Sequence, residues 1–261
     1  MVVLAGERPG GNALAQSLGL PSALLADIAG KPVIRWTFDA LFSAKHARLL
    51  VVGPAAELRE QHPQFTELTD DPRVQWHAPQ EGPAASAAFG IERLDRFPLL
   101  LTAADHALLQ GQWVDDFVAR ALQIAQVKGA DIVIGLVPYA RVRDQFPNSK
   151  RTLLRFTEGS YCGSNLFLVA GPQGMHGIRF WRSLEQLRKS PWRMARTLGW
   201  KLCLRYLLGR LSLAGAMQAL STAANCQVQV CELDEPKLAI DVDSLADYEL
   251  AKQLLSNATD S

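Results

Sequence analysis

Short apolar runs alternate with segments of helical spacing along the first half of this chain. The longest run is FPLLLTAAD, residues 97–105, which is almost uninterrupted and ends in an aspartate. A strand that is apolar on both sides must be buried on both sides, which is typical of a parallel sheet covered by helices on each face. The alternation therefore predicts an α/β fold with a mostly parallel sheet.

The same patterns place the individual elements. Strands are expected at residues 2–5, 48–53, 74–79, 97–105, 130–140, 151–156, 165–170, 226–233 and 238–243. Helices are expected at residues 31–44, 84–95, 113–126 and 246–255, and a turn at EGSYCGS, residues 158–164. We expect residues 1–255 to form a single domain with a helical, basic insert at 176–222, followed by a disordered tail at 256–261.

Composition limits the class of protein. The chain has 261 residues, 48% of them apolar, and a net charge of +1, which suits one large domain and gives no global sign of a nucleic-acid partner. Its four cysteines are scattered without a CxxC pair, so neither a zinc site nor a disulfide framework is expected. The N-terminus lacks a basic region before an apolar stretch, and the protein is expected to be cytoplasmic.

A glycine-rich segment, LAGERPGG at residues 4–11, follows the first expected strand. Glycines allow close approach of a ligand to the backbone, and the free N–H groups of such a turn can bind an anion. Arg8 could bind a phosphate through two parallel hydrogen bonds. By itself the segment is equally consistent with an ordinary turn, and its spacing matches neither a dinucleotide fingerprint nor a Walker loop.

Aspartates follow two of the expected strands. Asp105 ends the apolar run at 97–105, where its carboxylate could bind Mg²⁺ or, alternatively, cap a helix that starts near residue 106. His106 beside it is expected to be a packed or solvated histidine. Asp241 and Asp243 are two residues apart, so a strand would place both on one face, where one could join Asp105 around a metal or both could be surface residues.

Five segments, in this order, resemble the MobA-like nucleotidyltransferase superfamily: LAGERPGG, IAGKP, PLLLTAAD, GSNLFLV and DVDSLADYELA. The resemblance covers nearly the whole chain apart from residues 176–222. It implies a Rossmann-like, three-layer α/β/α sandwich of the nucleotide-diphospho-sugar transferase type that binds an NTP, CTP being favoured, and Mg²⁺. The implied reaction is attack of an acceptor phosphate on the α-phosphorus, with release of pyrophosphate.

The resemblance and the sequence patterns together suggest roles for residues of this chain. Catalytic roles fall on Arg8, Lys31 and Asp105, and metal ligation on Asp105, Asp243 and Asp241. Nucleotide contacts fall on Leu4, Ala5, Gly6, Arg8, Gly10, Gly11, Gly82, Pro83 and Ser86. Asn165 is placed near the acceptor, together with Lys150 and Arg151.

One position departs from the family's pattern. Relatives carry a lysine that contacts phosphate in K-A-L-x-x-(I/V)-x-G-K/R-P, where this chain has Ala23. Loss of one charge-assisted contact to the transition state costs about 2–4 kcal/mol. Lys150 and Arg151 are candidates to compensate, and a nucleotide sensor without turnover is the alternative. A GT-A-type glycosyltransferase is a third hypothesis, but DHA at residues 105–107 is not the DxD that it requires.

The basic insert allows three interpretations. It can be a pair of amphipathic helices docked on the sheet with a solvated basic face. It can bind an anionic membrane surface, with the protein peripheral at the inner membrane and a lipid or phosphorylated lipid headgroup precursor as acceptor. It can also bind a phosphate-rich acceptor or RNA. Against one acid, Glu185, residues 179–210 hold Arg179, Arg182, Arg188, Lys189, Arg193, Arg196, Lys201, Arg205 and Arg210, with Trp181, Trp192, Trp200 and Tyr206 between them.

Overall fold

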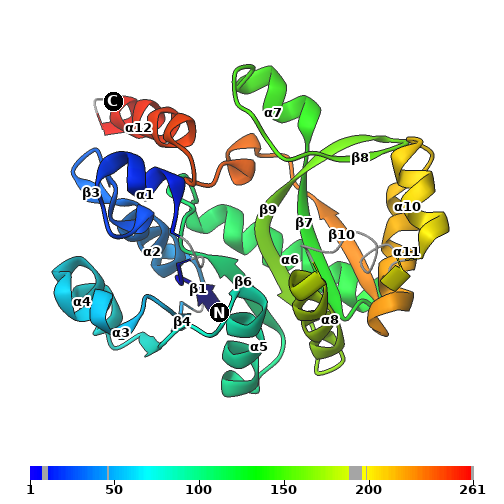
Figure 1. Cartoon of the computed structure of the whole chain (residues 1–261). Coiled ribbons are helices and arrows are strands. Elements are labelled where there is room, and N and C mark those ends of the chain that lie inside the picture. Colours follow the sequence, from blue (N-terminus) through cyan, green and yellow to red (C-terminus); the bar gives the residue numbers. More distant parts are fainter. Residues whose placement is uncertain (8–10, 46, 188–195, 198, 260–261) are drawn as a thin grey trace.

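The computed structural model describes residues 1–7, 11–45, 47–187, 196–197 and 199–259. An eight-stranded sheet forms the centre of this part of the chain (Figure 1). Its strands are β1 Val2–Leu4, β4 Leu49–Val52, β5 Val74–His77, β6 Leu99–Ala103, β7 Ile132–Pro138, β8 Leu154–Phe156, β9 Gly159–Val169 and β10 Val228–Glu232. A separate ribbon pairs β2 Asp27–Ile28 with β3 Lys31–Pro32.

Helices surround the sheet, and two short 3₁₀ helices, η1 Ala23–Leu25 and η2 Pro236–Ala239, lie in its connections. The α-helices are α1 Ala13–Leu18, α2 Val33–Ser43, α3 Ala56–Gln61, α4 Pro63–Thr69, α5 Pro83–Leu94, α6 Gly111–Lys128, α7 Tyr139–Gln145, α8 Gly174–Leu187, α10 Trp200–Leu207, α11 Leu213–Ala224 and α12 Leu245–Thr259. Local sequence sets several ends: Asn12 caps the first turn of α1 with its side chain, and Gly129 ends α6 at a φ of 63°.

The strand order across the sheet is β10-β7-β9-β6-β1-β4-β5, with β8 added beside β9. Strand β1 pairs in parallel with β4 and β6, and β4 with β5. Strand β9 is antiparallel to its neighbours β6 and β7, and β10 returns to a parallel pairing with β7. The expectation of a mostly parallel sheet is confirmed.

Successive residues of the central strands enter different hydrophobic cores. Val2 and Leu50 pack with residues of α5, α8 and α11, whereas Val3 and Val51 pack with residues of α2, α4 and α6. Because side chains alternate along a strand, this division places one layer of helices on each face of the sheet. The three-layer α/β/α architecture is confirmed, and it leaves the ends of the parallel strands as the free edge for a site.

Two local predictions were wrong. Residues 238–243 do not form a strand: Pro236 begins η2, Ile240 N–H donates to Lys237 O, and Val242 N–H donates to Asp105 O. These backbone groups therefore bond within a turn and to another loop, outside any strand ladder. Likewise EGSYCGS is mostly strand, because β9 starts at Gly159 and residues 161–163 pair with β7, which confines the turn to residues 157–158.

The C-terminal helix is longer than expected. Helix α12 continues to Thr259, which is four residues into the segment predicted as a disordered tail. Its start is fixed by Asp247, whose backbone N–H and carboxylate both bond to Ser244 Oγ. The tail prediction therefore needs correction for residues 256–259, and residues 260–261 lie outside the described part of the chain.

The basic insert contributes three described helices. Helix α8 packs against α5, and α11 packs against α8 and β10, so these two belong to one helical layer of the sandwich. Within the described ranges, no helix combines the length and apolar character needed to cross a membrane. Four predicted surface residues of the insert lie outside those ranges: Arg188, Lys189, Trp192 and Arg193.

Candidate functional site

The loop after β1 is held close to two neighbouring loops. Ala5 N–H donates to Val52 O, and a Cβ on Gly53 would lie 2.5 Å from the backbone of Ala5 and Gly6, so only glycine fits at residue 53. A Cβ on Gly6 would lie 3.1 Å from Pro79. Gly11 has a φ of 82°, which favours glycine. Arg8 and Gly10, predicted to bind phosphate, lie outside the described residues.

Asp105 follows β6 on a backbone that is fixed from several sides. Ala104 N–H donates to Leu4 O, and the Thr37 hydroxyl donates to Ala104 O at 2.9 Å. Asp105 O accepts from Val242 N–H, which ties the Asp105 loop to the segment that carries Asp241 and Asp243. The backbone thus brings the end of β1, the end of β6 and residues 240–243 to one edge of the sheet.

Two cavities meet at Asp105. The larger, about 240 Å³, runs from the glycine-rich loop to helix α8. Its lining includes Leu4, Gly6, Gly82, Pro83, Ser86, Asp105, Asn165 and Asp241, all predicted site residues. The smaller, about 60 Å³, is lined by Leu4, Ala5, Gly6, Asp105 and Asp243 of the predicted set, together with Glu7, Asn12, Ala23, Leu24 and Val242. The structure therefore joins the glycine-rich loop with all three candidate metal ligands.

Residues 80–86, which form the turn before α5 and its first residues, line one side of the larger cavity. Gly82 precedes α5, and Pro83 occupies its first turn, where a missing N–H costs nothing. The buried Ser86 hydroxyl accepts from Gln80 N–H at 3.0 Å and holds the loop against the helix. Glu185 of α8 accepts from Ala84 N–H at 3.2 Å, so it supplies the acidic group that α5 lacks in its own first turn.

Two aromatic rings also line the larger cavity. The ring of Trp181 on α8 stacks on Phe167 of β9, with centroids 6.4 Å apart and planes inclined by 23°. Asn165, two residues before Phe167, has a φ of 53°, a conformation that asparagine tolerates better than most residues. From the sequence, Trp181 was only one of the aromatic residues of the basic insert; the structure shows that it lines the same cavity as Asn165.

Three of the predicted cations are not among the described residues that line the two cavities at Asp105. Lys31 forms an ion pair with Asp39 at 3.0 Å and lies over the Trp36 ring. Lys150 is exposed and is not among the described residues that line either cavity. Arg151 is buried, 6% exposed, and forms ion pairs with Asp241 at 3.1 Å and with Asp247. Arg151 is therefore not a spare cation. Its guanidinium, just before β8, already pairs with Asp241 after η2 and with Asp247 in α12.

Asp105 and Asp243 fit Mg²⁺ by the chemistry of their side chains. Asp105 and Asp243 line the same small cavity and offer hard oxygen donors, and Mg²⁺ often takes only one or two protein carboxylates while phosphates and water supply the rest. Asp241 forms an ion pair with Arg151, so its carboxylate is only partly available as a third ligand. No group of three or more His, Cys, Asp or Glu side chains with ligand geometry occurs in the described ranges.

His106 is packed, as the sequence predicted. It is buried, and burial lowers the pKa of its imidazole, with the charge of Asp241 acting in the opposite direction. Among the described residues, no hydrogen-bond partner faces its Nδ1. A neutral, buried imidazole next to Asp105 serves the packing of this loop.

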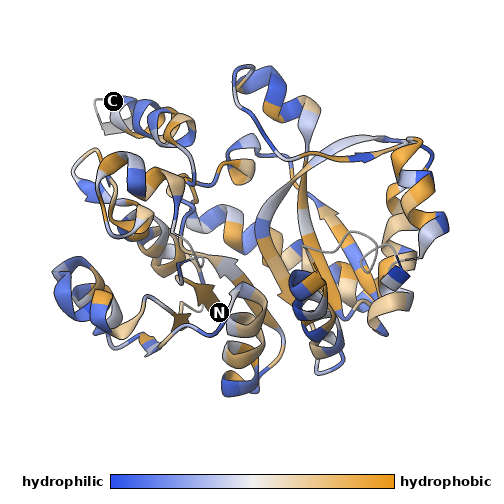
Figure 2. Cartoon of the chain, viewed as in Figure 1, coloured by the Kyte–Doolittle hydropathy of each residue, from blue (hydrophilic) through white to orange (hydrophobic). Residues whose placement is uncertain are grey.

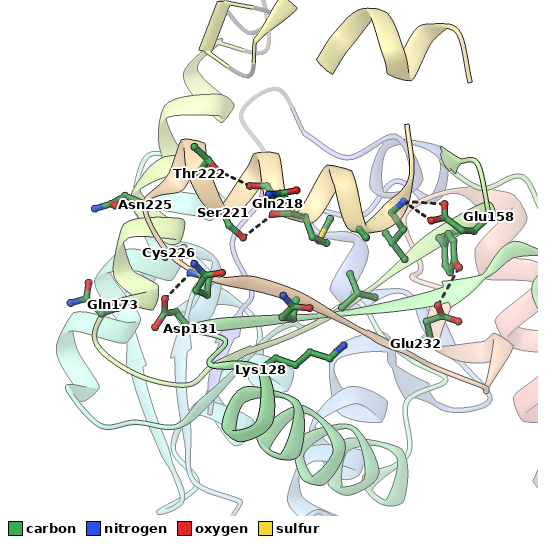
Figure 3. Close-up of a pocket in the computed structure, with 17 residues that line it drawn as sticks. Lys128, Asp131, Glu158, Gln173, Gln218, Ser221, Thr222, Asn225, Cys226 and Glu232 are labelled. Atoms are coloured by element: carbon green, nitrogen blue, oxygen red, sulfur yellow. Dashed lines mark hydrogen bonds between the residues drawn. The ribbon is translucent and has the colours of Figure 1, made fainter. Parts of the chain in front are cut away.

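A cavity of about 1000 Å³, larger than the two at Asp105, lies along the edge strand β10 under α11 and holds none of the predicted site residues (Figure 3). Its carboxylates bond locally: Asp131 accepts from Gln227 N–H and Glu158 from Leu213 N–H, while Glu232 accepts from the Tyr161 hydroxyl. Size alone therefore does not select the candidate site; we select it by the convergence of the predicted residues on Asp105.

Comparisons with known proteins identify the family of this chain. The family model described as "MobA-like NTP transferase domain" matches residues 1–158, which include the glycine-rich loop, residues 80–86 and Asp105. A search of curated proteins found no match.

Several solved structures share the fold. A hypothetical transferase from Thermus thermophilus is 25% identical, with a TM-score of 0.75 over 95% of this chain and 98% of the other. A CMP:2-keto-3-deoxy-manno-octonic acid synthetase complexed with CTP is 11% identical, with a TM-score of 0.60 over 99% and 98% of the two chains. A 2-C-methyl-D-erythritol 4-phosphate cytidylyltransferase, also from Thermus thermophilus, is 15% identical, with a TM-score of 0.53 over 98% of both chains.

Proposed function

Because the chain belongs to the MobA-like NTP transferase family, we propose that it transfers a nucleoside monophosphate from an NTP to a phosphorylated acceptor. The observation that carries this proposal is the meeting of the glycine-rich loop, residues 80–86, Asp105 and Asp243 at one edge of the sheet. CTP is the favoured donor, since solved relatives of this fold include a CTP complex and cytidylyltransferases. The acceptor is a phosphorylated small molecule or a phosphorylated lipid headgroup precursor.

In the proposed reaction, an oxygen of the acceptor phosphate bonds to the α-phosphorus. The bond from the α-phosphorus to the bridging oxygen breaks, and pyrophosphate leaves with the electron pair. Such a transfer needs little proton chemistry from the protein and depends on positioning and on neutralising phosphate charge. Asp105 and Asp243 would hold Mg²⁺, which supplies part of that neutralisation when bound.

Each part of the candidate site has a proposed task. The backbone at Ala5, Gly6 and Gly11 faces the triphosphate, with Arg8 as the cation that the sequence predicts there. The loop at residues 80–86 contacts the base or ribose, held in place by Ser86 and Glu185. Asn165 and the Phe167–Trp181 pair face the acceptor. These elements orient two reactants against each other and exclude water from the space between them.

A nucleotide sensor without turnover is the second candidate, and Ala23 is the observation that favours it. Ala23 lines the small cavity together with Asp105 and Asp243, so the lysine of relatives is missing beside the proposed reacting phosphates. Lys150 is exposed and outside both cavities, and the proposal that it compensates fails if Lys150→Ala keeps full transfer activity.

Pyrophosphate release tests the two candidates. The full chain is incubated with Mg²⁺, each of the four NTPs and a panel of phosphorylated sugars, polyols and lipid precursors. Release that depends on acceptor, and that Asp105→Asn abolishes while the exposed control Asp116→Asn keeps it, supports the transferase. Binding of an NTP without release for every pair favours the sensor, and absence of both refutes the proposed site.

A further inference from the structure

Helix α10 presents an apolar stripe to solvent. Its large side chains Trp200, Leu204, Leu207 and the following Leu208 are 66%, 47%, 80% and 58% exposed. Spacings of four, seven and eight residues place these four side chains on one side of the helix. They make up half of the eight large apolar side chains that are exposed in the described ranges.

The opposite side of α10 is the one that contacts the protein. The Tyr206 ring packs against Phe156 of β8 with centroids 6.3 Å apart, and its hydroxyl accepts from Arg155 N–H at 3.3 Å. These contacts fix the rotation of the helix, so the apolar stripe points outward. Helix α10 lies at one end of the molecule beside β8 (Figure 1), and it carries both hydrophobic and hydrophilic residues (Figure 2).

Basic side chains border this stripe. Lys201, Arg205 and Arg210 are exposed, as is Arg196, which precedes them in the sequence. From residue 196 to residue 212 the sequence contains no acidic residue. An exposed apolar stripe beside cations, with a tryptophan at its start, matches the chemistry of an anionic lipid surface.

We propose that α10 docks the protein on an anionic membrane surface, with Trp200, Leu204, Leu207 and Leu208 inserted at the headgroup level. The helix has eight residues, far fewer than the roughly 20 needed to cross a bilayer, so it lies in the plane of the interface. A second copy of the chain is a poor occupant, because a two-fold contact would set the cations of both copies against each other. This docking is independent of the proposed function and holds for a transferase and a sensor alike.

Co-sedimentation of the full chain with vesicles tests the docking. Vesicles of phosphatidylcholine with phosphatidylglycerol are compared with pure phosphatidylcholine, at low and high salt. The wild type is expected to bind the anionic vesicles and to lose most binding at high salt. Leu207→Glu should lower the partition coefficient by at least about tenfold. Its matched control is Val127→Glu, since Val127 is 75% exposed on α6 and should bind like the wild type.

A charge pair completes the design. Arg205→Glu reverses one bordering cation and should weaken binding to anionic vesicles by about 30-fold, given roughly fivefold for each unit of charge near the surface. Lys45→Glu reverses an exposed charge outside α10 and should leave binding unchanged. All of these side chains are exposed, so folding is expected to survive and is checked by circular dichroism.

Three results would overturn the proposal. The first is a folded wild type that ignores anionic vesicles at low salt. The second is equal binding by Leu207→Glu and Val127→Glu. The third is a stripe that serves self-association instead: the wild type would then be a dimer that Leu207→Glu converts to a monomer, with no effect on vesicles. Failure of this test leaves the pyrophosphate assay unaffected, so the two proposals stand or fall separately.

Discussion

Replacing Arg151 with methionine is expected to cost about 3–5 kcal/mol of unfolding free energy. The Arg151 side chain is 6% exposed, and it pairs with Asp241 and with the buried Asp247 while also donating to Ala239 O at 3.2 Å. Methionine keeps much of the volume but removes the charge, which leaves a buried carboxylate without compensation. With a urea m-value of about 3 kcal/mol/M, the midpoint of unfolding should fall by about 1–2 M.

The neighbouring residue provides the control for this experiment. Lys150 is exposed, so Lys150→Met should change the unfolding free energy by less than about 0.5 kcal/mol. Adding Asp247→Asn to Arg151→Met should recover part of the loss, because it removes the uncompensated charge. If Arg151→Met unfolds within about 1 kcal/mol of the wild type, the claim that this residue is structural is refuted, and a role at the acceptor becomes the better explanation.

Three further predictions concern single sites. Burial raises the pKa of Cys162 to about 11, so roughly 0.1% of it is thiolate at pH 8. Because Cys226 and Cys231 are also buried, native protein should react quickly with a thiol reagent only at Cys203, and Cys203→Ala should lose that fast phase. Glu185→Ala should lower the unfolding free energy by about 0.5–2 kcal/mol, because Ala84 N–H in the first turn of α5 loses its acceptor. The control Glu92→Ala, which removes an exposed ion pair with Arg179, should cost less than about 0.5 kcal/mol, and equal losses would argue against capping of α5 by Glu185. Ala23→Lys should raise the rate of pyrophosphate release by roughly 30–1000-fold, because a cation then reaches the small cavity, whereas the control Ala119→Lys on the exposed side of α6 should leave the rate unchanged. A folded Ala23→Lys variant with an unchanged rate would contradict the role given to this position.

Periodicity predicted most of the fold because the apolar pattern of buried parallel strands is local. FPLLLTAAD fixed both a central strand and the place of Asp105, since a strand buried on both faces can end only at an edge of the sheet. The prediction of a strand at residues 238–243 was wrong because the apolar residues there are buried by a turn that packs on other loops. Burial by a turn and burial in a strand give the same sequence pattern over so few residues.

The site could be predicted in outline but not in its partners. Position at a strand end singled out Asp105 and Gly82, the family resemblance added Ser86, and all three line one cavity. Arg151 looked like a free cation because its two carboxylate partners are about 90 residues away, and no local pattern reports such a pairing. Glu185 and Trp181 lie in a basic stretch of the sequence, and only the packing of α8 against α5 shows that Trp181 lines the cavity and that Glu185 accepts from Ala84 N–H.

The most direct test of the proposed nucleotide site is a thermal-shift measurement with each of the four NTPs and Mg²⁺. A ligand at 100 times its Kd adds about 2.7 kcal/mol of stability, which corresponds to a rise in Tm of roughly 5–10 °C for a chain of this size. We predict such a rise with at least one NTP, largest with CTP, retained in Asp116→Asn and lost in Asp105→Asn. The account is contradicted if no NTP raises the Tm, or if Asp105→Asn responds like the wild type.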